Sequence, residues 1–102
     1  MTLMEFSIYP LDKGASLSPY VARALTIVEK SGLEYRLTPM GTVVEGEWDL
    51  LLNLLTQCLR ELEKDSERIS LQAKFDHKKG ASGTINSKIK SVQDKAGLQF
   101  RT

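Results

Sequence analysis

The sequence predicts a ferredoxin-like α+β sandwich, in which two helices cover one face of a four-stranded antiparallel sheet and a short helix follows. Three observations predict it. Apolar and polar residues alternate in short segments, which is the pattern of half-buried strands. Two longer segments carry apolar residues at helical spacing. The elements follow one another in the order β-α-β-β-α-β, the split arrangement of this fold. At 102 residues the chain suits one domain, and we expect residues 1–102 to form it.

The first strand and the first helix are predicted from alternation and from helix-end signals. Residues 4–8 alternate apolar and polar side chains. Ser18 is a suitable N-cap, and Pro19 follows at the first helical position, where its missing N–H costs nothing. Gly32 suits a left-handed C-terminal stop. We therefore expect the first helix over about 19–31.

A β-hairpin is predicted next. Residues 33–37 and 42–45 favour strands, and the segment 38–41 between them reads TPMG. Proline presets the second position of a turn and glycine relaxes its exit, so Pro39 and Gly41 predict the corner.

The remaining elements follow the same two periodicities. A second amphipathic helix is predicted over about 47–64 and a fourth strand over 68–76. Apolar residues then recur from Ile85 to Ala96 at helical spacing, which predicts a short C-terminal helix. The expected core consists of Met4, Phe6, Ile8, Leu25, Val28, Tyr35, Leu37, Val43, Leu52, Leu55, Leu59, Leu71 and Phe75.

Composition and charge narrow the function classes. With 41% hydrophobic and 26% charged residues, the chain resembles ordinary globular domains, and no segment approaches the roughly 20 apolar residues that span a bilayer. No signal-peptide pattern precedes the first strand, so we expect a cytoplasmic protein without membrane contact. The net charge is +1, yet residues 1–73 are acidic and residues 74–102 are basic. Because no aromatic residues cluster with these lysines, a contact within the chain or between subunits is favoured over nucleic acid.

Searches for catalytic and metal chemistry find little. His77 stands alone beside two lysines and is expected to be a solvated loop residue, and Cys58 on an apolar helix face is expected to be a buried, inert thiol. Residues 12–16 favour a plain loop over an anion-binding nest. No glycine-rich phosphate-binding motif occurs, and the third strand lacks the basic and aromatic residues of RNA-recognition domains. We therefore expect no catalytic residues, no metal and no cofactor.

The sheet face opposite the helices is predicted to be polar. It is expected to carry Glu5, Ser7, Tyr9, Glu34, Arg36, Thr38, Thr42, Val44, Gln72 and Lys74. A solvated face would have this character, but hydroxyls, an amide, an aromatic ring and an arginine also recognise ligands. The C-terminal helix has an apolar edge that would be buried by covering this face, within the chain or from a second subunit. The face is thus either solvated or part of a small-molecule site.

Four segments together resemble one known family. They are 7–11 (SIYPL), 31–33 (SGL), 39–46 (PMGTVVEG) and 88–92 (KIKSV). In these segments the chain resembles the MTH1187/YkoF-type thiamine-binding family, formerly an uncharacterised protein family. The resemblance implies a ferredoxin-like fold, a homodimer or homotetramer, and binding of thiamine or its hydroxymethylpyrimidine moiety without catalysis.

This ligand suggests which side chains form the site. Thiamine joins an aminopyrimidine, which has donor and acceptor edges, to a thiazolium cation, so its site needs polar groups, apolar walls and an aromatic ring or carboxylate. The candidate ligand-binding residues are Ser7, Tyr9, Arg36, Thr38, Met40, Thr42 and Glu45. Tyr9 and Met40 would form walls. Strict alternation directs Glu45 away from Thr42, so Glu45 either binds the ligand or caps the second helix.

The leading hypothesis is a non-enzymatic, cytoplasmic protein that binds thiamine or its hydroxymethylpyrimidine moiety as a carrier or sensor. The alternative is a ligand-gated regulatory or interaction module that acts on a partner protein. An enzyme acting on pyrimidines or phosphate esters is disfavoured, because no acid/base or metal constellation is present in the sequence.

Overall fold

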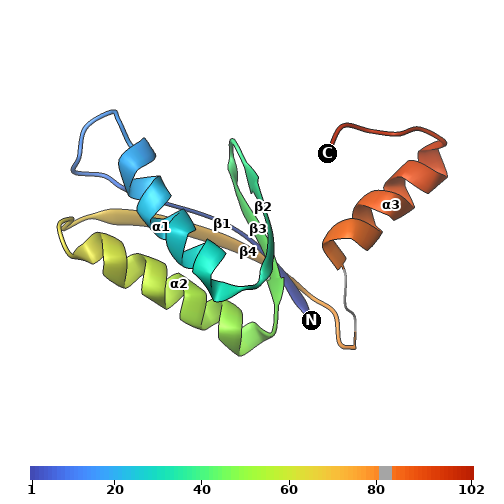
Figure 1. The fold of residues 1–102 in the computed structure, drawn as a ribbon, viewed down its shortest axis with the longest axis horizontal. Helices are drawn as coiled ribbons and strands as arrows, with labels where there is room; N and C mark the ends of the chain where they lie inside the picture. The colour runs from blue at the N-terminus through green and yellow to red at the C-terminus, as the bar shows by residue number, and fades with distance from the viewer. Residues whose placement is uncertain (81–83) are drawn as a thin grey trace.

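The structure is a computed structural model that describes residues 1–80 and 84–102 (Figure 1). Its elements are β1 (Thr2–Pro10), α1 (Ser18–Ser31), β2 (Glu34–Thr38), β3 (Gly41–Gly46), α2 (Trp48–Glu63), β4 (Ile69–His77) and α3 (Thr84–Ala96). This order confirms the predicted ferredoxin-like fold.

The four strands form one antiparallel sheet in the order β2-β3-β1-β4. The long central strand β1 places Met4 opposite Val44 of β3 and opposite Phe75 of β4. The helices α1 and α2 lie together on one face of the sheet, whereas α3 projects away from this sandwich (Figure 1). Among the described helices, none is both long and apolar enough to cross a membrane.

The ends of α1 test the predicted capping signals. Gly32 adopts φ +76° after the last helical residue and donates its N–H to the Glu29 carbonyl, which confirms the glycine stop. The predicted N-cap is wrong by one residue. The helix starts at Ser18, because the carbonyl of Leu17 already accepts the N–H groups of Tyr20 and Val21, and no side chain caps it.

The buried core lies between α1, α2 and the sheet. It consists of Met4, Phe6, Ile8, Ala24, Val28, Val44, Leu51, Leu54, Leu55, Cys58 and Leu62. Five of the expected core residues are therefore confirmed, namely Met4, Phe6, Ile8, Val28 and Leu55. Four others pack against the core while partly buried, namely Leu25, Tyr35, Leu59 and Phe75.

Four expected core residues lie outside the core. Leu37 is 63% exposed because β2 is an edge strand, and Leu71 is 37% exposed on the opposite edge strand. Leu52 is 38% exposed because its neighbour Leu51 occupies the buried stripe of α2, and one residue rotates the side chain by about 100°. Val43 is only partly buried.

The predicted faces of β3 are also wrong. The turn pairs Thr38 with Gly41, so Thr42 faces Leu37 and Val44 faces Tyr35. Thr42 and Val44 therefore share the helix-covered face with Phe6 and Met4, their partners in β1, and both are buried. A shift of one residue in register exchanges the two faces of a strand, so the intervening residues, including Glu45, belong to the open face.

Polar contacts hold the first turns of α3 to the open side of the sheet. The Glu45 carboxylate accepts the backbone N–H of Ile85 at 3.0 Å, and Arg36 donates to the Asn86 side chain at 3.0 Å. Lys88 pairs with Asp76 of β4. The rest of α3 extends outward, with Val92 59% exposed. Accordingly the radius of gyration is 15.0 Å, against about 13 Å for a compact domain of this length.

Candidate functional site

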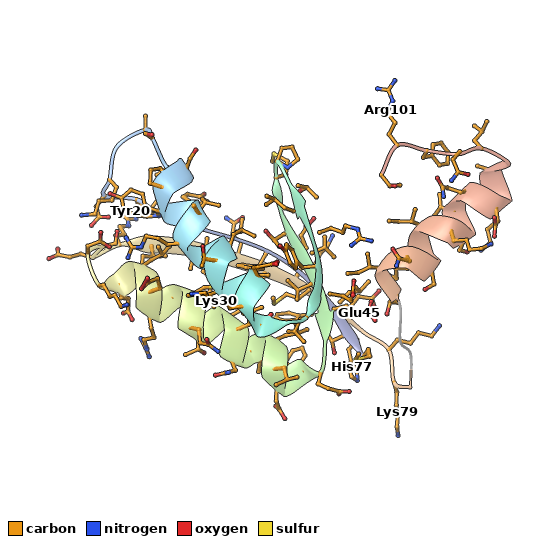
Figure 2. All side chains as sticks on the ribbon, in the orientation of Figure 1. Tyr20, Lys30, Glu45, His77, Lys79 and Arg101 are labelled. Atoms are coloured by element: carbon orange, nitrogen blue, oxygen red, sulfur yellow. The ribbon has the colours of Figure 1, made fainter. Side chains whose placement is uncertain are left out.

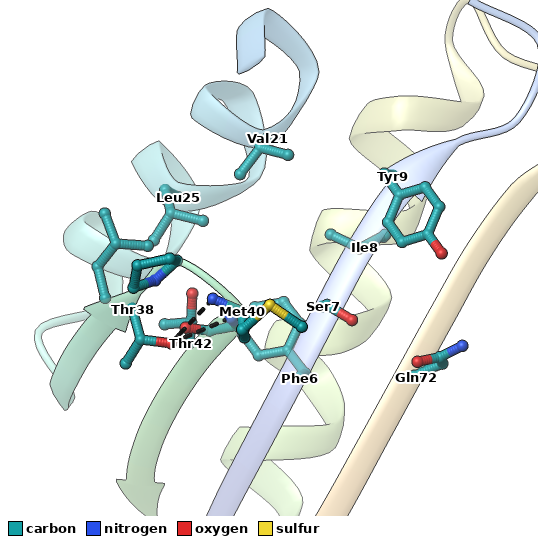
Figure 3. A pocket seen from close by; sticks show the side chains of 13 residues that line it. Phe6, Ser7, Ile8, Tyr9, Val21, Leu25, Thr38, Met40, Thr42 and Gln72 are labelled. Carbon is teal, nitrogen blue, oxygen red and sulfur yellow. Dashed lines mark hydrogen bonds between the residues drawn. The ribbon is translucent and has the colours of Figure 1, made fainter. Parts of the chain in front are cut away.

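A cavity of about 320 Å³ lies where β1 and the hairpin separate (Figure 3). β1 pairs with β4 along its whole length but with β3 only from Thr2 to Phe6. The segment Ser7–Pro10 therefore has an edge that β3 leaves open. The tip of the hairpin and the helix α1 enclose the space beside that edge, and β4 adds Gln72 to the lining.

Apolar side chains form most of the cavity wall. Val21 and Leu25 face it from α1, and Phe6 and Ile8 face it from β1 (Figure 3). Met40 lies at the tip of the hairpin and is 87% exposed, so its flexible thioether is free to pack on whatever occupies the cavity.

Polar groups line the cavity from several strands. Thr42 contributes a hydroxyl from β3 on the same side of the sheet as Leu25. Ser7 and Tyr9 of β1 and Gln72 of β4 also line the cavity, with their polar ends on the opposite side of β1 (Figure 3). The hydroxyl of Thr38 is already occupied by the turn. It donates to the Gly41 carbonyl at 2.8 Å and accepts the N–H groups of Met40 and Gly41 at 3.2 and 3.1 Å, which uses its one donor and two acceptor sites. Thr38 therefore shapes the hairpin tip.

The main chain of Ile8 adds a donor and an acceptor. Alternate residues of a central antiparallel strand bond to opposite neighbours. Leu11 donates its N–H to the Arg68 carbonyl, and Lys78 donates to the Met1 carbonyl, so the odd-numbered residues of β1 bond toward β4. The even-numbered residues bond toward β3, which ends its pairing at Phe6. The N–H and C=O of Ile8 are therefore directed toward the cavity.

The position of Gly41 shows why the corner of the hairpin, residues 38–41, contains a glycine. A side chain at this position would place its Cβ 3.0 Å from the carbonyl oxygen of Phe6. Glycine is therefore needed for the close approach of β3 to β1 next to the cavity, as well as for the turn.

The structure groups five of the seven candidate residues around this cavity, namely Ser7, Tyr9, Thr38, Met40 and Thr42. It places the other two elsewhere. Arg36 is directed toward Asn86, and the buried Glu45 carboxylate caps α3. The expected alternative that Glu45 caps the second helix is wrong, because the register directs it to the opposite face of the sheet.

Sequence reasoning missed Val21, Leu25 and the main chain of Ile8 as parts of the cavity wall. An apolar helical stripe looks the same whether it faces a core or a cavity. The free edge of β1 follows only from the observed pairing.

The remaining reactive groups lie outside the cavity. Burial raises the pKa of the Cys58 thiol to about 11, as expected for an inert thiol. His77 is exposed as expected, but it ends β4 rather than lying in a loop, and its Nδ1 shares a hydrogen bond with the Thr2 hydroxyl at 2.7 Å.

The Asp12 carboxylate accepts hydrogen bonds from the Glu67 N–H and the Ser66 hydroxyl. These two bonds lower the pKa of Asp12 and attach the loop that begins there to the segment before β4. Within residues 1–80 and 84–102, no cluster of His, Cys, Asp and Glu side chains is suited to a metal ion.

The fold and the cavity define a ferredoxin-like domain with a pocket of small-molecule size. Residues 4–93 match the family of thiamine-binding proteins, and the chain belongs to this family. This confirms the resemblance seen in the sequence.

Relatives and solved structures agree with this assignment. The chain is 36% identical over 88 residues to the UPF0045 protein MJ1052 of Methanocaldococcus jannaschii, covering 86% of this chain and 88% of that protein. It is 31% identical over 98 residues to a UPF0045 protein of Methanothermobacter thermautotrophicus, covering 93% and 99%. The crystal structure of MJ1052 matches with a TM-score of 0.84 at 34% identity, covering 91% of this chain and 96% of that one. A Thermotoga maritima structure, with a suggested role in thiamine biosynthesis or salvage, matches with a TM-score of 0.79 at 26% identity, covering 89% and 97%.

Proposed function

We propose that this protein binds thiamine or its hydroxymethylpyrimidine moiety in the cavity between β1, the hairpin tip and α1, as a non-enzymatic carrier or sensor in the cytoplasm. One observation carries the proposal. Two of the segments that resemble the thiamine-binding family, 7–11 and 39–46, come together in the fold and supply residues on both sides of this cavity. Membership of that family supports a thiamine-related ligand.

The chemistry of the cavity suits an aminopyrimidine. A flat ring would pack between Leu25 and Met40, and its polar edge would meet the hydroxyl of Thr42 and the main chain of Ile8. Ser7 lies across β1 and would reach the part of the ligand that extends past the strand edge (Figure 3). The Tyr9 ring offers an aromatic surface for a neighbouring cation. Among the described residues that line the cavity, none carries a charged side chain, so the proposed ligand is held without an ion pair.

Calorimetric titration with thiamine, the free pyrimidine and the free thiazole tests the proposal. We expect both pyrimidine-containing compounds to bind and the thiazole alone to bind far more weakly. Thr42→Val keeps the shape of the side chain but removes its hydroxyl. It should weaken binding about 2- to 10-fold, the value of one neutral hydrogen bond.

Thr56→Val is the matched control, because Thr56 lies exposed on α2 and bonds only to its own helix, at the Leu52 carbonyl. It should leave the affinity unchanged. Equal binding of the thiazole and the pyrimidine, or equal losses in the two variants, would contradict the proposed cavity.

We also propose that the chain assembles into a homodimer or homotetramer. The apolar stripe of α3 is exposed beyond Ile89, the open face of β4 lies uncovered, and residues 1–73 and 74–102 carry opposite net charge. A second subunit would bury these surfaces together.

Light scattering should therefore report two or four times the chain mass of 11.4 kDa. Val92→Glu places a charge on the exposed apolar stripe and should shift the assembly toward the monomer. Ser91→Glu adds the same charge about 100° away around the helix and should shift it less. A monomeric parent protein would contradict the assembly.

A ligand-gated regulatory module is a second candidate function, and one observation favours it. The hairpin that forms a wall of the cavity also anchors α3, through Arg36 on β2 and Glu45 on β3. A ligand that moves the hairpin would then move α3. Light scattering with and without thiamine distinguishes the two functions, since only a gated module should change its assembly with ligand.

A further inference from the structure

We propose that the groove between α3 and the β2–β3 side of the sheet is a second binding site, which takes a small organic anion with an apolar body. The groove measures about 790 Å³. Residues from β1, β2 and β3 line one side, and α3 with the C-terminal segment lines the other. Among the described residues it shares Leu37 and Thr38 with the cavity proposed for thiamine, and the other lining residues differ, so the two sites are separate.

The charges in the groove favour an anion. Arg36, Lys88, Lys90 and Arg101 line the groove, and of these the Arg101 guanidinium points outward, away from α3 and the sheet (Figure 2). Among the described residues that line the groove, none has a carboxylate side chain. Lys88 and Lys90 pair with Asp76 and Asp94, which lie outside the lining. Neither arginine forms an ion pair within the described part of the chain, so both retain an uncompensated charge.

Arg36 is held in place by neutral partners. Its Nη1 donates to the Tyr35 carbonyl at 3.2 Å, and its Nη2 donates to the Asn86 side-chain oxygen at 3.0 Å. These bonds orient the guanidinium without neutralising it, and they use two of its five N–H groups. The remaining groups can bind two oxygens of one phosphate or carboxylate, which is the arrangement that gives arginine its strongest anion contacts.

The floor of the groove is apolar. Leu3 and Val43 contribute to it from the open face of the sheet, and Ile85 and Ile89 contribute from α3. A bare inorganic ion would leave this surface in water, whereas an aromatic or aliphatic body would cover it. The combination of the Arg36 guanidinium and this floor identifies the ligand class.

Titration with phenyl phosphate, followed by backbone amide NMR shifts, tests the site. We expect the shifts to gather at Arg36, Asn86 and Ile89. Arg36→Gln should weaken binding at least about tenfold, because a hydrogen bond to a charged group is lost. Arg60→Gln is the matched control, since Arg60 lies exposed on α2 and pairs with Glu63, and it should leave the affinity unchanged.

The anion and its body are tested separately. Phenol, which lacks the charge, should not bind, and inorganic phosphate should bind more weakly than phenyl phosphate. Benzoate compared with phenyl phosphate assigns the anionic group as a carboxylate or a phosphate. An unchanged affinity in a folded Arg36→Gln protein, or equal binding of inorganic and phenyl phosphate, would overturn the proposal. Phenyl phosphate contains no pyrimidine, so its binding to this groove is measured independently of thiamine binding to the cavity.

Discussion

Thiamine at a hundred times its dissociation constant should raise the melting temperature of this protein by on the order of ten degrees. A ligand that binds only the native state at this concentration stabilises it by about 2.7 kcal/mol. In a domain of this size each kcal/mol moves the melting temperature by roughly 4–8 °C. Dissociation of an oligomer during unfolding would change the size of the shift but not its direction.

Melting curves with four compounds measure this stabilisation and show which part of thiamine the protein recognises. Thiamine and the free hydroxymethylpyrimidine should both stabilise the fold, while the free thiazole should leave the melting temperature unchanged. Thiamine pyrophosphate tests whether the cavity accepts a charged phosphate, because none of the described residues that line it has a basic side chain. A protein whose melting temperature responds to none of these compounds at millimolar concentration is not a thiamine-binding protein.

Leu51→Ala should destabilise the fold by about 2–5 kcal/mol, while Leu52→Ala should cost less than about 1 kcal/mol. Leu51 is fully buried in the core, so truncation leaves a cavity against the sheet. Leu52 is 38% exposed on the next position of the same helix, so water replaces much of what is removed. The two variants have the same composition and the same loss of volume.

Urea unfolding of the two variants gives both free energies directly. Neither leucine lines the thiamine cavity, so thiamine affinity measured on each folded variant should match that of the parent protein. Equal destabilisation by the two substitutions would show that the buried stripe of α2 is assigned to the wrong residues.

Local patterns determined the elements of this fold. Alternation over a few residues marked β1 and β4, helical spacing marked α2 and α3, and Gly32 marked the end of α1 at a residue with φ +76°. These signals work because each depends on neighbours in the sequence. The order of the elements then restricted the topology to the observed sheet, and the family segments identified the hairpin tip.

Only the tertiary structure decided which side of each element faces the core and where the cavity lies. The hairpin pairing directed Thr42 and Val44 to the helices and Glu45 to α3, against the expected faces. Alternation shows that a strand has two faces but does not identify them, because a one-residue change of register exchanges the two.

The cavity depended on the point where β3 leaves β1 at Phe6, beside Val21 and Leu25 of α1. That separation brings together residues far apart in the chain. Ser7 and Met40 were recognisable from the sequence because they belong to family segments, whereas an apolar helix face carries no local sign of an empty space beside it. Burial and enclosure result from contacts between distant segments, and the fold must be assembled before those contacts exist.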